Sequence, residues 1–217
     1  MIVVIGIPIA RPARSLRRVT GVAPAAALAA ARSGARVELV GKVGDDEAGD
    51  AAALALAQAG VGHAALLRDP AHATPVAIET ESSGAAVDHP VDDVGDAPRA
   101  LEPADRRRWP ALEAEDVELA LRYLPDIRTI VVAEPVSDAV LKIVRQAARY
   151  LAARLVVVTA FADAAPDADL VLAPPDDDRD SAFAGLLGEV AAALERGEGV
   201  ENALESAKAA LGVSAAR

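Results

Sequence analysis

The sequence predicts an α/β fold with a mainly parallel central sheet. Continuous apolar runs that end in glycine, such as residues 1–6, are typical of strands buried on both faces of such a sheet. Alanine-rich segments with helical character separate these runs. Since parallel strands need a crossover connection, usually a helix, this alternation favours a parallel sheet covered by helices.

The first sixty residues supply two strand–helix units. The expected elements are strand 1–6, helix 24–33, strand 37–40 and helix 47–59. Pro24 falls in the first turn of its helix, where a missing N–H costs nothing, and Gly34 is the residue expected to end that helix. Gly60 closes the second helix in the same way.

The pattern changes between residues 63 and 89. Three short strand candidates, 63–68, 75–80 and 85–89, follow one another with Asp-Pro and Ser-Ser-Gly turns and no helix between them. They predict a small antiparallel sheet that stands off the main body and is inserted into a single domain, 1–217. Residues 90–110, rich in proline, aspartate and arginine, are expected to be a connecting loop.

The second half returns to alternating strands and helices. The expected elements are helix 113–123, strand 128–133, helix 136–150, strands 154–159 and 169–173, and helices 181–195 and 199–211. Hydrophobic residues make up 53% of the chain but aromatic residues only 2%. The core must therefore be filled by alanine, valine and leucine, with helices packed close to the sheet.

Composition excludes several classes of function. The chain has no cysteine, so disulfides and cysteine–zinc sites are excluded and a cytoplasmic location is expected. A net charge of −11 argues against a nucleic-acid partner, because binding phosphates needs a basic face. No apolar stretch reaches the roughly 20 residues that cross a bilayer. One basic loop, with Arg11, Arg14, Arg17 and Arg18, is most simply a solvated surface.

Three segments occur in an informative order. They are Thr20-Gly21-Val22-Ala23-Pro24-Ala25, Gly41-Lys42-Val43-Gly44-Asp45-Asp46-Glu47-Ala48-Gly49-Asp50 and Ser181-Ala182-Phe183-Ala184-Gly185-Leu186-Leu187-Gly188. This order resembles the ribokinase-like (phosphofructokinase-B type) carbohydrate kinases, whose frame reads G-G-x-x-x-N, G-x-V-G-x-D-x-x-G and G-A-G-D-x-F-x-x-G. The resemblance implies a ribokinase-like three-layer sandwich in which residues 63–89 form a β lid over the sugar. It also implies transfer of the γ-phosphoryl group of ATP to an alcohol.

The residues at the family's catalytic positions differ from its pattern. In the family, an aspartate that closes a glycine-rich turn accepts the proton of the attacking hydroxyl. The resemblance places Ser181 at this base position and replaces both glycines by Asp178 and Asp180. Asp180 is an alternative base one residue out of register. The simpler interpretation is that Asp180 or Ser181 caps the helix that follows.

The sugar side is altered as well. The resemblance places Arg11 where the family has a sugar-binding aspartate, and Gly21 and Ala25 in the G-G-x-x-x-N segment, where only the glycine remains. Glu134, after strand 128–133, matches a family position close to the substrate, but a surface glutamate at a strand end is the simpler explanation. In the segment 41–50 the glycines are expected to permit tight turns, and Asp45 and Asp46 to cap the next helix.

The part of the chain that corresponds to the family's nucleotide-binding region is short. Residues 168–178 resemble the family's strand leading into an N-x-x-E motif, with Pro175 in place of the asparagine and Asp177 or Asp178 for the glutamate. The chain then enters the Phe183 helix almost directly, whereas the family inserts further strands and a helix. No cofactor is therefore expected, and ATP with magnesium only if the family activity survives. No metal site is expected.

Three hypotheses of function follow. The first is a degenerate kinase that binds a ligand or a partner; the second is an active sugar or nucleoside kinase that uses Asp180 or a carboxylate of 176–178 as base. The third is a binder of small anions at Arg11 and its neighbours. A homodimer through the lid is also expected, because Val76 and Ile78 would otherwise leave an apolar face in water.

Overall fold

The computed structural model describes residues 1–11, 19–77, 108–174 and 182–210. Its centre is a six-stranded sheet in the order β5-β4-β1-β6-β7-β8, with every neighbouring pair parallel. The strands are β1 (Ile2–Ile5), β4 (Val37–Gly44), β5 (Leu66–Asp69), β6 (Thr129–Val132), β7 (Arg154–Val158) and β8 (Leu170–Leu172). The predicted mainly parallel sheet is confirmed.

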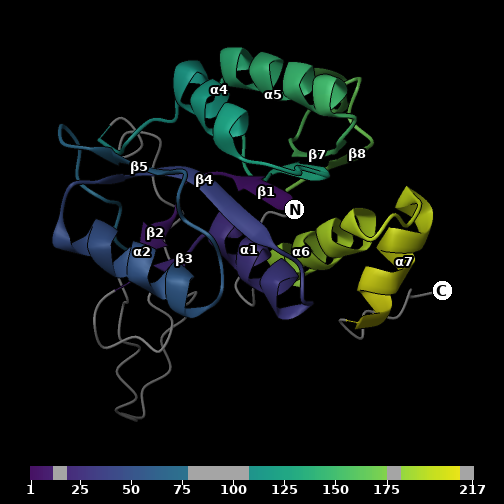
Figure 1. Cartoon of the computed structure of the whole chain (residues 1–217), viewed down its shortest axis with the longest axis horizontal. Helices are drawn as coiled ribbons and strands as arrows, with labels where there is room; N and C mark the ends of the chain where they lie inside the picture. The colour runs from purple at the N-terminus through teal and green to yellow at the C-terminus, as the bar shows by residue number, and fades with distance from the viewer. Residues whose placement is uncertain (12–18, 78–107, 175–181, 211–217) are drawn as a thin grey trace, which may run out of the picture.

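Helices cover both faces of the sheet and make a three-layer sandwich (Figure 1). One layer holds α1 (Val22–Arg32), α2 (Glu47–Gln58), α6 (Ala182–Glu195) and α7 (Val200–Ala210); the other holds α4 (Ala114–Tyr123) and α5 (Asp138–Leu151). Side chains of β1 alternate between the two interfaces: Ile2 and Val4 pack with α1 and α6, whereas Val3 and Ile5 pack with α4 and α5. Burial on both faces explains why this strand reads as a continuous apolar run.

Helix ends follow the local signals in the sequence. Gly34 and Gly60 have φ values of +83° and +77°, a conformation that strains any residue with a Cβ, and each comes just after the end of its helix. Pro24 lies in the first turn of α1, as expected. The helix boundaries differ from the predicted ones by at most two residues, which is within the usual uncertainty of helix ends, whereas β4 runs four residues beyond its predicted end.

The small antiparallel sheet is present, but other residues form it. It pairs β2 (Ile9–Ala10) with β3 (Val19–Thr20), and Val76 adds an isolated bridge to Ala10. The expectation that 63–68 belongs to the lid is wrong, because β5 pairs in parallel with β4 as an edge strand of the main sheet. A short apolar run fits a half-buried edge strand as well as a lid strand, so the pattern alone did not separate them. Candidates beyond residue 77 lie outside the described residues.

The connection from β7 to β8 is also unusual. It contains only a short 3₁₀ turn, η1 (Ala162–Ala164), where a parallel crossover commonly holds an α-helix.

No helix in the described part of the chain is both long and apolar enough to cross a membrane. The domain assignment 1–217 stays a prediction.

Candidate functional site

The candidate site lies at the carboxyl ends of the central strands. Ligands of open α/β sheets bind at this edge, because the loops and helix N-termini that follow the strands converge there. β1, β4 and β6 end here beside one another, and the small sheet of β2 and β3 follows directly from β1. Residues just beyond these strand ends are therefore the ones that could contact a ligand.

Glu134 joins two of these strand ends. Its Oε1 accepts a hydrogen bond from the backbone N–H of Ile7, which follows β1, and the side chain is only partly exposed. A Cβ added at Gly6 would lie 3.0 Å from this oxygen, so the carboxylate folds directly over the end of β1. Glu134 thus lies at a strand end and is partly exposed, as a surface glutamate would be, but it also hydrogen-bonds a residue 127 positions earlier in the chain.

The start of α1 lies at the same edge. Gly21 precedes the helix with φ +108°, and a Cβ there would be 3.5 Å from the carbonyl oxygen of Ile7. The helix start has no side-chain cap. Ala25 donates its N–H to the Gly21 carbonyl at 3.1 Å and presents only a methyl group, so it offers nothing to a hydroxyl ligand.

Arg11 lies close to this helix start. It follows β2, is partly buried, and its Nη2 is 3.5 Å from Oγ1 of Thr20 on the paired strand β3. The structure thus brings Arg11, Thr20 and Gly21 together near the start of α1. The remaining arginines of the predicted basic loop, together with Ser181, Asp180 and Asp178, lie outside the described residues.

The segment 41–50 is a second polar centre, at the end of β4. Asp46 caps α2, as predicted, by accepting the Gly49 N–H at 2.8 Å. Neither Gly44 nor Gly49 is among the described glycines with positive φ. The turn requires glycine for another reason: a Cβ at Gly44 would be 2.6 Å from Thr74 N, and one at Gly49 would be 2.9 Å from Thr74 Oγ1.

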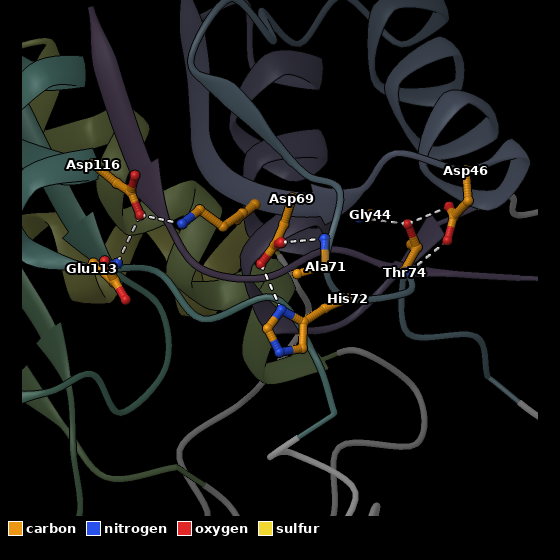
Figure 2. Close-up of polar contacts among 9 residues, drawn as sticks. Gly44, Asp46, Asp69, Ala71, His72, Thr74, Glu113 and Asp116 are labelled. Carbon is orange, nitrogen blue, oxygen red and sulfur yellow. Dashed lines mark hydrogen bonds and ion pairs between the residues drawn. The ribbon is translucent and has the colours of Figure 1, made fainter.

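Asp46 also binds Thr74, a partner that sequence reasoning missed. Its Oδ1 accepts from the Thr74 hydroxyl at 2.6 Å and its Oδ2 from the Thr74 N–H at 2.8 Å (Figure 2). Burial raises the pKa of the Asp46 carboxyl, but the hydrogen bonds from Thr74 and Gly49 and the charge of Arg68 outweigh it and hold this pKa below its usual value.

Two further pairs lie near this centre (Figure 2). Lys42 contacts Asp116 at 2.6 Å, and the same carboxylate oxygen accepts the Glu113 N–H. Asp69 accepts from Ala71 N and contacts His72 Nδ1, and these two hydrogen bonds hold the pKa of Asp69 below its usual value. No group of three acidic or histidine side chains suited to a metal occurs in the described residues.

A hollow of the described surface lies away from these strand ends. A groove of about 510 Å³ runs between α4 and α5, with Leu121, Ile143 and Tyr150 among its lining residues. It is mostly apolar and is formed by helix faces rather than by strand ends. We therefore assign the candidate site to the carboxyl edge of the sheet and not to this groove.

Solved structures share this architecture. The protein Sa239 superposes with a TM-score of 0.70 at 11% identity, covering 100% of this chain and 94% of that one. Ribokinase of Arabidopsis thaliana, solved with ribose and ATP, gives 0.62 at 14% identity and 97% and 90% coverage. A PfkB protein of Polaromonas sp. JS666 gives 0.60 at 16% identity and 98% and 96% coverage. At these identities the likeness establishes the fold, which is the ribokinase-like sandwich.

The family follows from the sequence itself. The sequence pattern of the pfkB family carbohydrate kinases matches residues 9–173, most of the chain, and this chain belongs to that family. None of the curated proteins is similar enough in sequence to be matched.

Proposed function

We propose that this chain is a pfkB-family protein that no longer transfers phosphate and acts by binding a ligand or a partner. The observation that carries the proposal is the residue at the family's base position, where the sequence has Ser181 instead of aspartate. A serine hydroxyl does not accept a proton at neutral pH without a base of its own, so the attacking alcohol would not be activated.

The neighbouring substitutions support the same proposal. Asp178 and Asp180 replace the glycines whose backbone N–H groups would face the phosphoryl group. Two unit charges about 4 Å apart interact by roughly 4 kcal/mol at an effective dielectric constant near 20. Carboxylates at these positions would therefore repel the transferring group rather than stabilise it.

The nucleotide side gives independent support. Only residues 173–181 separate the end of β8 from the start of α6, so the strands and helix that the family resemblance leads one to expect have no room there. The family match also stops at residue 173, before this segment. We therefore propose that ATP and magnesium are not cofactors of this chain.

The site residues favour a small anion as a second candidate ligand. Arg11 lies partly buried beside Thr20, close to the uncapped start of α1, where the family has a carboxylate for sugar hydroxyls. A guanidinium group favours carboxylates and phosphates over neutral sugars. Binding of this kind is short-range, because the net charge of −11 repels anions at a distance.

We also propose a homodimer through the predicted lid, at the part around Val76 that lies beside the small sheet. Val76 bridges to this sheet and is 44% exposed, so a second copy would cover an apolar edge. Light scattering at micromolar concentration should report a dimer; a monomer at all concentrations would contradict it.

The acidic charge gives no support for a nucleic-acid partner, and the cysteine-free sequence supports a cytoplasmic location.

A calorimetric panel tests the main proposal. ATP–magnesium, sugars, sugar phosphates, nucleosides and inorganic phosphate are titrated separately into the full chain. We expect no heat and no thermal stabilisation with ATP–magnesium, and no turnover of any sugar or nucleoside. Phosphate binding that is lost in Arg11→Leu would support the anion candidate. Turnover of any sugar or nucleoside would overturn the proposal in favour of an active kinase.

A further inference from the structure

Residues 69–74 form a segment that we call the strap, which leads from the end of β5 to Thr74 (Figure 2). Its first residue, Asp69, turns the chain by accepting the Ala71 N–H at 2.9 Å and contacting His72 Nδ1 at 2.8 Å. Its last residue, Thr74, is 4% exposed and is held by Asp46. The strap is thus fixed at both ends by aspartates, one of its own and one from the start of α2.

The strap packs directly against the glycines of the segment 41–50. A Cβ at Gly44 would lie 2.6 Å from both the His72 carbonyl oxygen and Thr74 N, and one at Gly49 would meet the Thr74 hydroxyl. Gly44 N–H also donates to Thr74 Oγ1 at 2.9 Å. Gly44, Asp46 and Gly49 therefore all contact one threonine, so the two glycines and the helix cap act together in packing the strap.

The strap continues into the small sheet. Directly after Thr74, the carbonyl oxygen of Pro75 accepts the Ala10 N–H at 2.8 Å, and the Ala77 N–H donates to the Ala10 carbonyl at 2.9 Å. Both backbone groups of Ala10 are thus held by residues next to the strap. Ala10 immediately precedes Arg11, so the position of that guanidinium group depends on this connection.

We propose that Asp46 and Thr74 are positioning residues whose clamp on the strap fixes the small sheet, and with it Arg11, at the carboxyl edge of the main sheet. The proposal rests on the proposed function only in that Arg11 belongs to the ligand site. Through the bonds of Thr74, the helix cap at Asp46 is linked to a site residue 35 positions earlier in the chain.

Amide hydrogen exchange of the ligand-free protein tests the clamp. Thr74→Val keeps the side-chain volume but removes the hydroxyl that joins Asp46 to Gly44. Loss of these bonds should lower the protection of the Ala10 and Ala77 amides by roughly ten- to hundredfold, because local opening needs less free energy once the clamp is gone. The core amides of Leu39 and Ala133 should change much less.

Two variants serve as matched controls. Thr74→Ser keeps the hydroxyl and should restore protection at Ala10 and Ala77 to within about threefold of the wild type. Thr129→Val makes the same chemical change at a buried strand position where the hydroxyl has no hydrogen-bond partner in the described residues, so it should not loosen the small sheet. If Thr74→Val does not fold, Asp46→Asn carries the same measurement, because an amide leaves only one acceptor oxygen.

The wild type offers a test without any variant. The Thr74, Ala10 and Ala77 amides should open in one event, with the same opening free energy and the same dependence on denaturant. Opening of the Ala10 amide independently of Thr74 would overturn the proposal. So would a loss of protection in Thr74→Val that is as large at the core amides of Leu39 and Ala133 as at Ala10 and Ala77. Neither result depends on a ligand, so failure in the calorimetric panel and failure here are separate outcomes.

Discussion

Gly188 of α6 and Ala26 of α1 meet at backbone contact. A Cβ at Gly188 would lie 2.4 Å from the Ala26 carbonyl oxygen, with the Ala29 methyl at 2.6 Å and Ala30 N at 2.9 Å. The two helices approach so closely because the facing residues are alanine and glycine. A chain with almost no aromatic residues thus fills its core by bringing backbones together.

Gly188→Ala should destabilise the protein although alanine is the better helix former. Helix propensity alone would favour alanine by about 1 kcal/mol, but the methyl group has no space and must push the helices apart, at a typical cost of 1–3 kcal/mol or more. We expect a net loss in the free energy of unfolding, measured by urea denaturation. Gly199→Ala is the control, since a Cβ there meets nothing within 4 Å; equal effects at both positions would contradict the packing argument.

Thr129→Val should stabilise the protein. Thr129 is fully buried in β6 and its hydroxyl oxygen has no hydrogen-bond partner in the described part of the chain. Valine has the same shape and removes a polar group whose burial is unfavourable, so the gain should be about 1 kcal/mol. A lower urea midpoint than that of the wild type would show that the hydroxyl has a partner in solution.

Features that depend on neighbouring residues could be predicted from the sequence, whereas contacts between residues far apart in the chain could not. Gly34 and Gly60 could be read as helix ends because the signal is local, and β1 because burial on both faces leaves a continuous apolar run. The role of Thr74 could not be read, because nothing around it in sequence indicates a bond to Asp46, 28 residues away. The same holds for Glu134 and Ile7, which are neighbours only once the parallel sheet has formed.

Acid should weaken the contribution of Asp46. Its folded-state pKa lies below the value of 3.8 expected in the unfolded chain, so the carboxylate stabilises the fold above that value. This contribution is lost as pH falls through the lowered folded pKa. The stability difference between wild type and Asp46→Asn should therefore shrink between pH 5 and pH 2, measured by urea denaturation at each pH. Asp45→Asn, at the exposed neighbour, is the control; a difference for Asp46→Asn that stays constant with pH would contradict the assignment.

Ser181→Asp alone should not create a kinase. Under the proposed function, the substitution supplies the family's base, but Asp178 and Asp180 remain where glycine N–H groups would face the phosphoryl group, and only residues 173–181 separate β8 from α6. A coupled assay of ATP hydrolysis and sugar phosphorylation should stay at background for this variant. The triple variant Asp178→Gly, Asp180→Gly, Ser181→Asp is the matched comparison. Turnover in the single variant would show that the anion-binding turn is intact.

Glu134 provides a test of the edge where the ligand site is placed. Its carboxylate accepts the Ile7 N–H, so Glu134→Ala removes the acceptor from a partly buried backbone group and should cost about 1–3 kcal/mol in unfolding free energy. Glu134→Gln keeps an oxygen that can accept the same bond and should cost well under half as much. Glutamine removes the charge and replaces one acceptor oxygen by an N–H donor, so a ligand effect seen in Glu134→Gln at unchanged stability would come from the carboxylate itself. Equal destabilisation by both variants would show that the charge, rather than the hydrogen bond to Ile7, holds β1 and β6 together at this edge.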